Sequence, residues 1–373
     1  MPPSPGWTLP FLPKRKRPRL LLFFHETAWS GAPIQLFHLA TWLKRHGWEL
    51  AAVVPKTSSP QSGSISAQLN DLGLDLFPIL DWSVAPDLGE LRALCERFDL
   101  VIANTLVTWA AVRAAHEAGV PAIWYIHETL LLDRLLEISP DIRPTLSLPN
   151  LLVMPTEHTA RRYLSLTHRP ITVVPYGIPP VTISSKENPD RSRTRFLLLG
   201  SYEHRKGQDL LLEAIAQLPP ALEARTLFQM IGRRLDPAFY EALAQQPARP
   251  NVLLCDEREH DEALAATAAA DVLICASRDE TMPIAILEAM SLGKAIITTN
   301  VGGTSEWLHD GGNSLIVPVE DSTALARAIQ RCAEDPRLME SLGKEARRTF
   351  RAEFSLDRLG RRFSQLIDQV VAR

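Results

Sequence analysis

The 373-residue sequence contains few of the features that mark specialised protein classes. Its four cysteines, Cys95, Cys255, Cys275 and Cys332, lie far apart without a C-x-x-C pair, which predicts free thiols in a reducing compartment rather than a disulfide framework. A net charge of -3 gives no overall attraction to nucleic acid. With 46% hydrophobic and 22% charged residues, the composition is that of an ordinary globular protein and predicts no membrane-spanning segment.

Three sequence motifs are also absent. No G-x-G-x-x-G follows the first predicted strand, which disfavours a dinucleotide-dependent enzyme. No D-x-D pair stands at a predicted strand end and no metal-ligand cluster is apparent, so we expect no obligatory metal and no cofactor. The apolar run Leu20 to Phe24 is too short for the hydrophobic region of a signal peptide.

Residues 1–18 are predicted to form a disordered basic tail, because six prolines fall within the first 19 residues together with the run Lys14 to Arg17. An alternative is peripheral contact with an anionic membrane, since each basic residue near such a surface adds about 1 kcal/mol. That alternative would suit an enzyme whose acceptor is lipid-linked.

From residue 19 onward, apolar strands alternate with helical segments of 10 to 15 residues. This alternation predicts parallel sheets covered by helices on both faces, with ligands at the carboxyl ends of the strands. We expect an α/β fold with two doubly wound, Rossmann-like domains facing a cleft. The predicted parts are a first domain at 19–178, a linker at 179–194, a second domain at 195–350 and a C-terminal helix at 351–373.

The stretch from Ala276 to Ser305 carries the strongest functional signal. It predicts a buried strand, a loop, a helix from about Pro283 to Leu292 that stops at Gly293, and a second strand. The amino end of such a helix favours anions. Glu280 precedes this helix and Glu288 lies within it. Two acids beside a phosphate site make sense when the ligand also carries hydroxyl groups, because a carboxylate accepts hydroxyl hydrogen bonds well.

The spacing Glu280-x7-Glu288, followed by VGGTSE, closely resembles the signature of retaining family-4-type glycosyltransferases with the two-domain GT-B fold. The segment from Gly200 to Gly207 is similar to the family's G-x5-K-G loop, although Ser201 stands where many members carry arginine. The turn at Pro175 to Ile178 also resembles a family turn, although Tyr176 and Pro179 depart from it.

The resemblance implies a role for individual residues. Glu288 would hold the ribose hydroxyls of a nucleotide-sugar, Glu280 and the amides after it the sugar hydroxyls and diphosphate, and Lys206 the diphosphate charge, with Arg205 as a hypothetical substitute for the missing arginine. His127, at a strand end, would reach the donor sugar. The implied catalytic residues are Glu280, Lys206, Arg205 and His127; the implied donor-binding residues are Glu288, Gly200, Ser201, Thr281, Met282, Pro283, Ile284, Gly232, Arg233 and Asp256; and the implied acceptor-side residues are Gly31 and Ala32.

The function implied by the resemblance is transfer of a sugar from a UDP- or GDP-linked donor to a saccharide or lipid-linked acceptor, with retention of configuration and without a metal. The resemblance further implies a cytoplasmic enzyme of bacterial surface polysaccharide or glycolipid synthesis, and a C-terminal helix that crosses back to the first domain. One alternative is a non-catalytic sugar-nucleotide-binding or partner subunit with a degenerate fold, which Ser201 and the altered turn would suit. Another is a phosphorylase-like or epimerase-like enzyme on the same fold.

Overall fold

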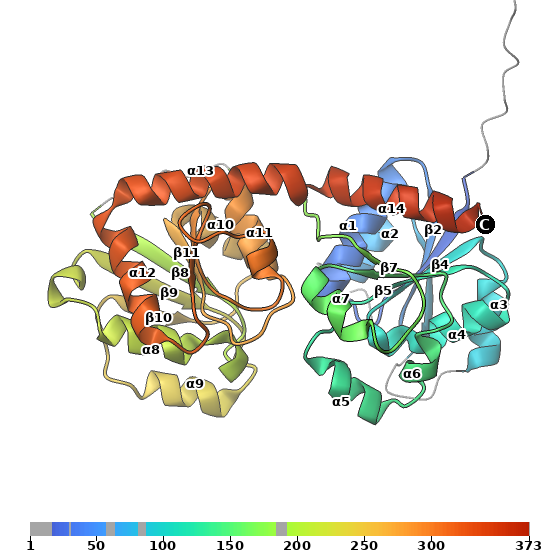
Figure 1. Cartoon of the computed structure of the whole chain (residues 1–373), viewed down its shortest axis with the longest axis horizontal. Coiled ribbons are helices and arrows are strands. Elements are labelled where there is room, and N and C mark those ends of the chain that lie inside the picture. Colours follow the sequence, from blue (N-terminus) through green and yellow to red (C-terminus); the bar gives the residue numbers. More distant parts are fainter. Residues whose placement is uncertain (1–16, 30, 57–63, 81–86, 184–191, 373) are drawn as a thin grey trace, which may run out of the picture.

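The protein consists of two lobes, each built on one parallel sheet (Figure 1). The computed structural model describes residues 17–29, 31–56, 64–80, 87–183 and 192–372. The first sheet has seven strands in the order β3-β2-β1-β4-β5-β6-β7, and the second has six in the order β10-β9-β8-β11-β12-β13. The order reverses beside β1 in the first sheet and beside β8 in the second, which are the switch points where ligands bind in doubly wound folds.

The strands are short and mostly buried, as is expected for parallel sheets covered on both faces. The first sheet comprises β1 (Arg19–Phe23), β2 (Glu49–Pro55), β3 (Asp75–Leu80), β4 (Leu100–Asn104), β5 (Ala122–Tyr125), β6 (Leu151–Met154) and β7 (Ile171–Val173). The second comprises β8 (Thr194–Leu199), β9 (Thr226–Ile231), β10 (Val252–Cys255), β11 (Val272–Cys275), β12 (Ala295–Thr299) and β13 (Leu315–Val317).

Helices follow most strands and cover both faces of each sheet. In the first lobe they are α1 (Gly31–Arg45), α2 (Ile65–Asp71), α3 (Leu88–Cys95), α4 (Trp109–Glu117), α5 (Leu131–Ile138), α6 (Ile142–Thr145) and α7 (Glu157–Tyr163). After β8 come α8 (Gln208–Ala216), α9 (Pro237–Ala244), α10 (His260–Ala269), α11 (Ile284–Leu292), α12 (Ser322–Glu334), α13 (Pro336–Glu353) and α14 (Leu356–Val371). The 3-10 turns are η1 (Leu106–Thr108), η2 (His204–Lys206), η3 (Pro220–Leu222) and η4 (Thr304–Glu306).

Helix α11 has the ends that its sequence predicts, within one residue. Pro283 stands at the N-cap rather than in the first turn. Gly293 ends the helix with φ of +73°, the left-handed conformation that glycine adopts without steric cost. Glu288 therefore lies on a helix that begins after Pro283 and ends at Gly293.

The C-terminal segment returns to the first lobe, where α14 lies against α1 (Figure 1). Gly360 of α14 meets the indole of Trp42 so closely that a Cβ atom would clash, and the Trp42 Nε1 donates to Asp357 at 3.1 Å. Phe363 packs edge-on against Tyr125 of β5 at 5.0 Å. Burial of a large apolar side chain such as Phe363 contributes about 1.5–3 kcal/mol, so this helix is part of the first lobe's core.

The predicted C-terminal helix at 351–373 is divided between two helices. Residues 351–353 end α13, and α14 starts only at Leu356, where the Ser355 hydroxyl accepts from the amide of Arg358 at 3.4 Å. The apolar pattern does not reveal the break, because Phe354 between the helices is itself fully buried. The predicted α/β fold class, with a helix crossing back to the first domain, is confirmed.

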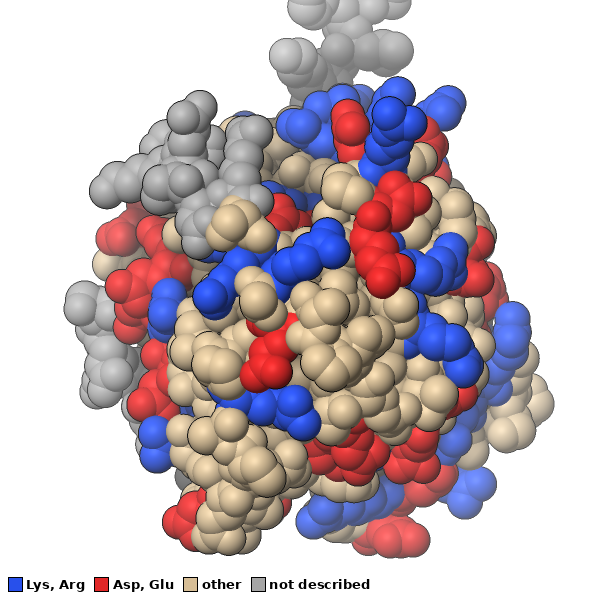
Figure 2. Space-filling model, turned by 90° about the vertical axis from the view of Figure 1, so that its left-hand side faces the viewer, with Lys and Arg blue, Asp and Glu red and all other residues tan. Residues whose placement is uncertain are grey.

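The predicted tail and part of the predicted linker lie outside the described residues, except for positions 17 and 18 of the tail. The part of the linker that lies outside is 184–191. The linker ends one residue earlier than predicted, because Thr194 already belongs to β8. All four cysteines are free, although Cys255 and Cys275 are only partly buried. Within the described residues, no helix is both long and apolar enough to cross a membrane. On the end of the molecule formed by the second lobe, basic and acidic side chains are interspersed around a central area without charged side chains (Figure 2).

Candidate active site

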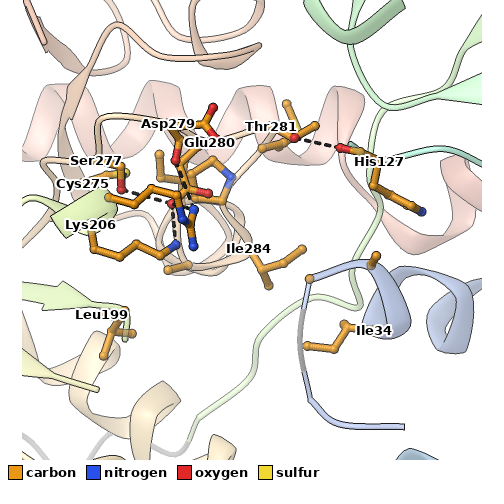
Figure 3. A pocket seen from close by; sticks show the side chains of 18 of the residues that line it. Ile34, His127, Leu199, Lys206, Cys275, Ser277, Asp279, Glu280, Thr281 and Ile284 are labelled. Atoms are coloured by element: carbon orange, nitrogen blue, oxygen red, sulfur yellow. Dashed lines mark hydrogen bonds and ion pairs between the residues drawn. The ribbon is translucent and has the colours of Figure 1, made fainter. Parts of the chain in front are cut away.

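A cleft of about 830 Å³ lies between the two lobes. It is lined by residues that follow β1, β4 and β5 of the first sheet and β8 and β11 of the second. Because all of these strands are parallel, their carboxyl ends bring distant loops together at the cleft. Figure 3 shows Lys206, Glu280 and Ile284 on one side of it and His127 and Ile34 on the other.

A basic turn forms one wall of the cleft. Strand β8 is followed by η2, and Gly207 then adopts φ of +72° before α8 begins. A Cβ atom at Gly207 would collide with the carbonyl of Ala276, so this glycine allows the turn to pack directly on the end of β11. The Lys206 Nζ donates to Glu280 Oε1 at 2.5 Å, and the Arg205 guanidinium lies 3.5 Å from the same oxygen (Figure 3). Two cations thus share one carboxylate.

Glu280 is held in the loop before α11 by further contacts. Its Oε1 also accepts from the hydroxyl of Ser277 at 3.0 Å, and the residue is 9% exposed. Arg205 in turn donates to the carbonyl of Asp279 and to Glu203 Oε1, at 3.2 Å and 2.9 Å. The amides at the start of α11 carry the positive end of its dipole, although the amide of Ile286 already donates to the carbonyl of Pro283 at 3.1 Å. The wall therefore combines cations with helix amides and can hold a diphosphate.

Glu288 lies deeper on the same wall. Burial raises the pKa of its carboxyl group to about 8, so most of it is protonated near neutral pH. Its Oε1 lies 3.6 Å from the Nε2 of His260, and burial lowers the pKa of that imidazole. These two groups are both neutral near pH 7 and do not form a charged pair in this structure.

His127 lies two residues after β5 on the opposite wall, and both of its ring nitrogens have partners. The Tyr176 hydroxyl lies 2.8 Å from Nδ1, and Asn104 Oδ1 lies 2.7 Å from Nε2. Because the Asn104 amide donates to the carbonyl of Ala32 at 3.2 Å, its oxygen accepts from Nε2–H and the tyrosine hydroxyl donates to Nδ1. Burial lowers the pKa of His127 to about 3, which keeps the ring neutral.

This network qualifies the prediction that His127 touches the donor sugar. A ring nitrogen could reach a ligand hydroxyl only if the hydrogen bond to Asn104 or Tyr176 were broken. In this structure His127 instead connects the loop at Ala32 to the turn at Tyr176, and its direct contact with donor stays a prediction.

Several contacts join the lobes around the cleft. The Thr281 hydroxyl donates to the carbonyl of His127 at 2.9 Å (Figure 3). Behind it, the Glu306 carboxylate accepts from the backbone amides of Glu157 and His158 at 2.9 Å and 2.7 Å. Because these amides start α7, a carboxylate of the second lobe caps a helix of the first. These contacts hold the two lobes against each other.

The structure brings most of the predicted residues together. The cleft lining includes the following of them: Glu280, Lys206, Arg205, His127, Glu288, Gly200, Thr281, Met282, Pro283, Ile284, Gly31 and Ala32.

Four predicted donor-binding residues lie outside this lining. Ser201 donates to Glu203 Oε1 at 2.7 Å, and Gly232 packs against the carbonyl of Gly200. Asp256 pairs at 2.7 Å with an exposed arginine next to Arg233, which is itself exposed. All four follow strand ends, as predicted: Ser201 follows β8, Gly232 and Arg233 follow β9, and Asp256 follows β10. A role in donor binding stays a prediction for these four residues.

Sequence reasoning did not single out several residues that line the cleft. Trp29 and His260 occupy loops or helix starts with no motif, and Glu203 lies inside the basic turn as an apparent solvent-facing acid. Tyr176 departs from the family turn, and its hydroxyl forms a hydrogen bond with His127. The one available signal for Glu203 was its position between Gly200 and Lys206. Among the described residues, no group of three or more His, Cys, Asp or Glu side chains could hold a metal ion.

Two family models match the chain in succession. Residues 29–181 match the model of Glycosyltransferase Family 4, and residues 182–349 match that of Glycosyl transferases group 1. The boundary between the matches falls just after β7, where the first sheet ends.

Curated relatives match over shorter regions. The lipopolysaccharide core biosynthesis glycosyltransferase LpsE of Rhizobium meliloti is 26% identical over 178 residues, which cover 45% of this chain and 48% of that protein. The lipopolysaccharide glucosyltransferase WaaG of Escherichia coli is 34% identical over 122 residues, or 32% of each chain. The chain thus spans about half or less of the length of these relatives.

Solved structures match almost the whole chain. The Anabaena protein Alr3699/HepE, crystallised with UDP-glucose, has a TM-score of 0.79 at 18% identity, covering 95% of this chain and 100% of that one. Sucrose-phosphate synthase from Thermosynechococcus elongatus has a TM-score of 0.78 at 19% identity, with coverage of 95% and 100%. With two parallel-sheet lobes, a cleft at their switch points and both family models in sequence, the chain belongs to the family-4-type glycosyltransferases of GT-B fold.

Proposed function

We propose that the protein transfers a sugar from a nucleoside-diphosphate sugar, UDP- or GDP-linked, to an acceptor hydroxyl. The observation that carries this proposal is the meeting of Lys206, Arg205 and Glu280 at the start of α11, with Glu288 on the same helix. This set provides positive charge and helix amides for a diphosphate and carboxylates for hydroxyl groups, which are the two chemistries of a nucleotide-sugar. The Anabaena neighbour bound to UDP-glucose supports a donor of this class.

In this proposal the cations change partners when the donor binds. Lys206 is held by Glu280 in this structure, so its ammonium group is positioned without being left as an unpaired, partly buried charge. A phosphate oxygen then takes the place of the Glu280 carboxylate at Lys206. Glu280 becomes available to accept hydrogen bonds from the sugar hydroxyls, while Arg205 keeps the diphosphate neutralised.

We further propose that transfer occurs with retention and without a metal. The bond from the anomeric carbon to the diphosphate oxygen breaks, the bond to the acceptor oxygen forms on the same face, and the acceptor's proton passes to the departing phosphate oxygen. The protein's contribution is stabilisation of charge on the leaving diphosphate by Lys206, Arg205 and the α11 amides. The closed lobes exclude water, which would otherwise hydrolyse the donor.

The test is transfer of sugar from purified UDP- and GDP-linked donors, with Lys206→Ala compared against the exposed Lys344→Ala. We expect Lys206→Ala to lower turnover about 10²–10³-fold while remaining folded, since it removes one donor that stabilises the leaving group. Near-normal turnover in Lys206→Ala would contradict the site assignment. Absence of both transfer and nucleotide binding in the wild type would instead favour a non-catalytic partner subunit.

Two further measurements test retention of configuration and metal independence. Nuclear magnetic resonance of the product's anomeric proton reports retention or inversion. Activity that is lost with chelator and restored by magnesium would refute metal independence.

The names of LpsE and WaaG support a place in lipopolysaccharide-type surface glycan synthesis, with a saccharide or lipid-linked acceptor. A cytoplasmic location, peripheral at the membrane, would fit that role. Sedimentation of the protein with anionic vesicles, and loss of sedimentation on removal of residues 1–16, would test the membrane contact.

A further inference from the structure

An aromatic contact joins the two lobes on the donor side of the cleft. Trp29, in the loop after β1, stacks on His260 at the start of α10, with ring centroids 5.7 Å apart and planes 7° from parallel. The indole also meets the edge of Phe37 in α1, at 5.6 Å and 79°. Trp29 is therefore held between the core helix of the first lobe and an imidazole of the second.

His260, on which Trp29 stacks, also lies close to the carboxyl group of Glu288. The 3.6 Å between His260 Nε2 and Glu288 Oε1 is slightly too long for a direct hydrogen bond. Both residues line the cleft, so a ligand atom can approach them. They are an acceptor and an imidazole nitrogen on one wall, with neither satisfying the other.

A hydroxyl group is the ligand that suits both at once. It can donate its proton to the carbonyl oxygen of the neutral carboxyl group and accept from an imidazole N–H, or donate to one and be packed against the other. Two adjacent hydroxyls, as on a ribose, would occupy both groups fully. An apolar group at the same place would leave the buried carboxyl group of Glu288 without a partner, which is costly, and would cover the imidazole of His260, which is 43% exposed in this structure.

We propose that His260 is a specificity-determining residue of the donor site, which together with Glu288 holds a ribose hydroxyl, while Trp29 fixes the imidazole by stacking on it. The inference rests on the proposed function, because it requires a nucleoside diphosphate as ligand. It adds that the first lobe takes part in ribose recognition through Trp29. Ribose recognition is then complete only when the lobes are closed.

The test is calorimetric binding of UDP and GDP, and of the 2′-deoxy and 3′-deoxy forms of whichever binds. The variants are His260→Ala and Trp29→Ala, with Trp29→Phe as the matched control that keeps a stacking ring. We expect His260→Ala to weaken binding of the ribonucleotide up to about tenfold, as loss of one hydrogen bond to a partly exposed side chain does. The same variant should leave almost unchanged the affinity for the deoxy form that lacks the hydroxyl held by His260.

Trp29→Ala should show the same selective pattern with a smaller loss, and Trp29→Phe should bind nearly as wild type. An equal loss for the ribonucleotide and both deoxy forms, or no loss in His260→Ala, would overturn the role of His260. Tighter binding in Trp29→Ala would mean that the indole occupies the ligand's space, and would overturn the role of Trp29. If the wild type binds neither UDP nor GDP, the proposed function fails and this inference fails with it.

Discussion

Replacement of Glu288 by glutamine is expected to change the pH dependence of stability. The carboxyl group has a pKa of about 8 in the folded protein, against 4.5 for the unperturbed group, because burial penalises its charged form. The folded state therefore binds the proton more tightly than the unfolded state. By linkage, wild-type stability falls as pH rises from 4.5 to about 8 and is constant above that range.

The magnitude follows from the pKa difference, at about 1.4 kcal/mol for each pKa unit. Relative to strongly acidic pH, where Glu288 is protonated in both states, the wild type loses about 2 kcal/mol of unfolding free energy at pH 6 and about 5 kcal/mol at pH 9. At pH 6 this loss arises because the group is ionised in the unfolded state alone. Glutamine cannot ionise, so Glu288→Gln gains about 3 kcal/mol relative to wild type between these two pH values. For a domain of about 150–250 residues this corresponds to a relative rise in melting temperature of about 6–12 °C.

The assay is thermal unfolding of both proteins at pH 6 and pH 9, with the exposed Glu340→Gln on α13 as control. A constant offset between Glu288→Gln and wild type can arise from imperfect amide hydrogen bonding, and it does not affect the comparison between pH values. A difference in melting temperature that is the same at both pH values would refute the reasoning. A control that changes as much as Glu288→Gln would also refute it.

Three further changes have clear expected outcomes. Gly207→Ala should destabilise the second lobe by several kcal/mol, because its φ of +72° disfavours a side chain and its Cβ would meet the Ala276 carbonyl; an unchanged denaturation midpoint would contradict this. Glu306→Ala should open the lobes by removing a cap worth about 1–2 kcal/mol, and small-angle scattering should then give a larger radius of gyration, whereas an unchanged radius would mean that other contacts hold the lobes closed. Tyr176→Phe removes the hydrogen bond to His127 Nδ1 and should lower stability by about 1–3 kcal/mol; no loss would show that the histidine finds another donor.

The sequence predicts helix α11 well because the signals for this helix are local. Pro283 and Gly293 mark the ends of α11 through their own backbone restrictions, and the spacing from Glu280 to Glu288 places both acids near one helix without further information. The alternation of strands and helices likewise predicted two doubly wound lobes, since parallel sheets need such crossovers.

The rest of the site depends on contacts between distant segments. Tyr176 and His127 are 49 residues apart in the sequence, and no motif near either residue indicates that they form a hydrogen bond. Trp29 and His260 meet only because the lobes close. The break between α13 and α14 could not be predicted from the apolar pattern, because Phe354 continues that pattern and is buried although it is not helical.

The return of α14 to the first lobe has a consequence for synthesis of the chain. A chain that leaves the ribosome from its amino end completes the strands of the first sheet, and then the whole second lobe, before α14 appears. Until then the surface of α1 around Trp42, which Gly360 later covers, is exposed to water. The first lobe to be made is thus the last to be completed. A chaperone that binds the growing chain would meet an incomplete first lobe, and a stop codon before α14 would leave that lobe incomplete beside a finished second lobe.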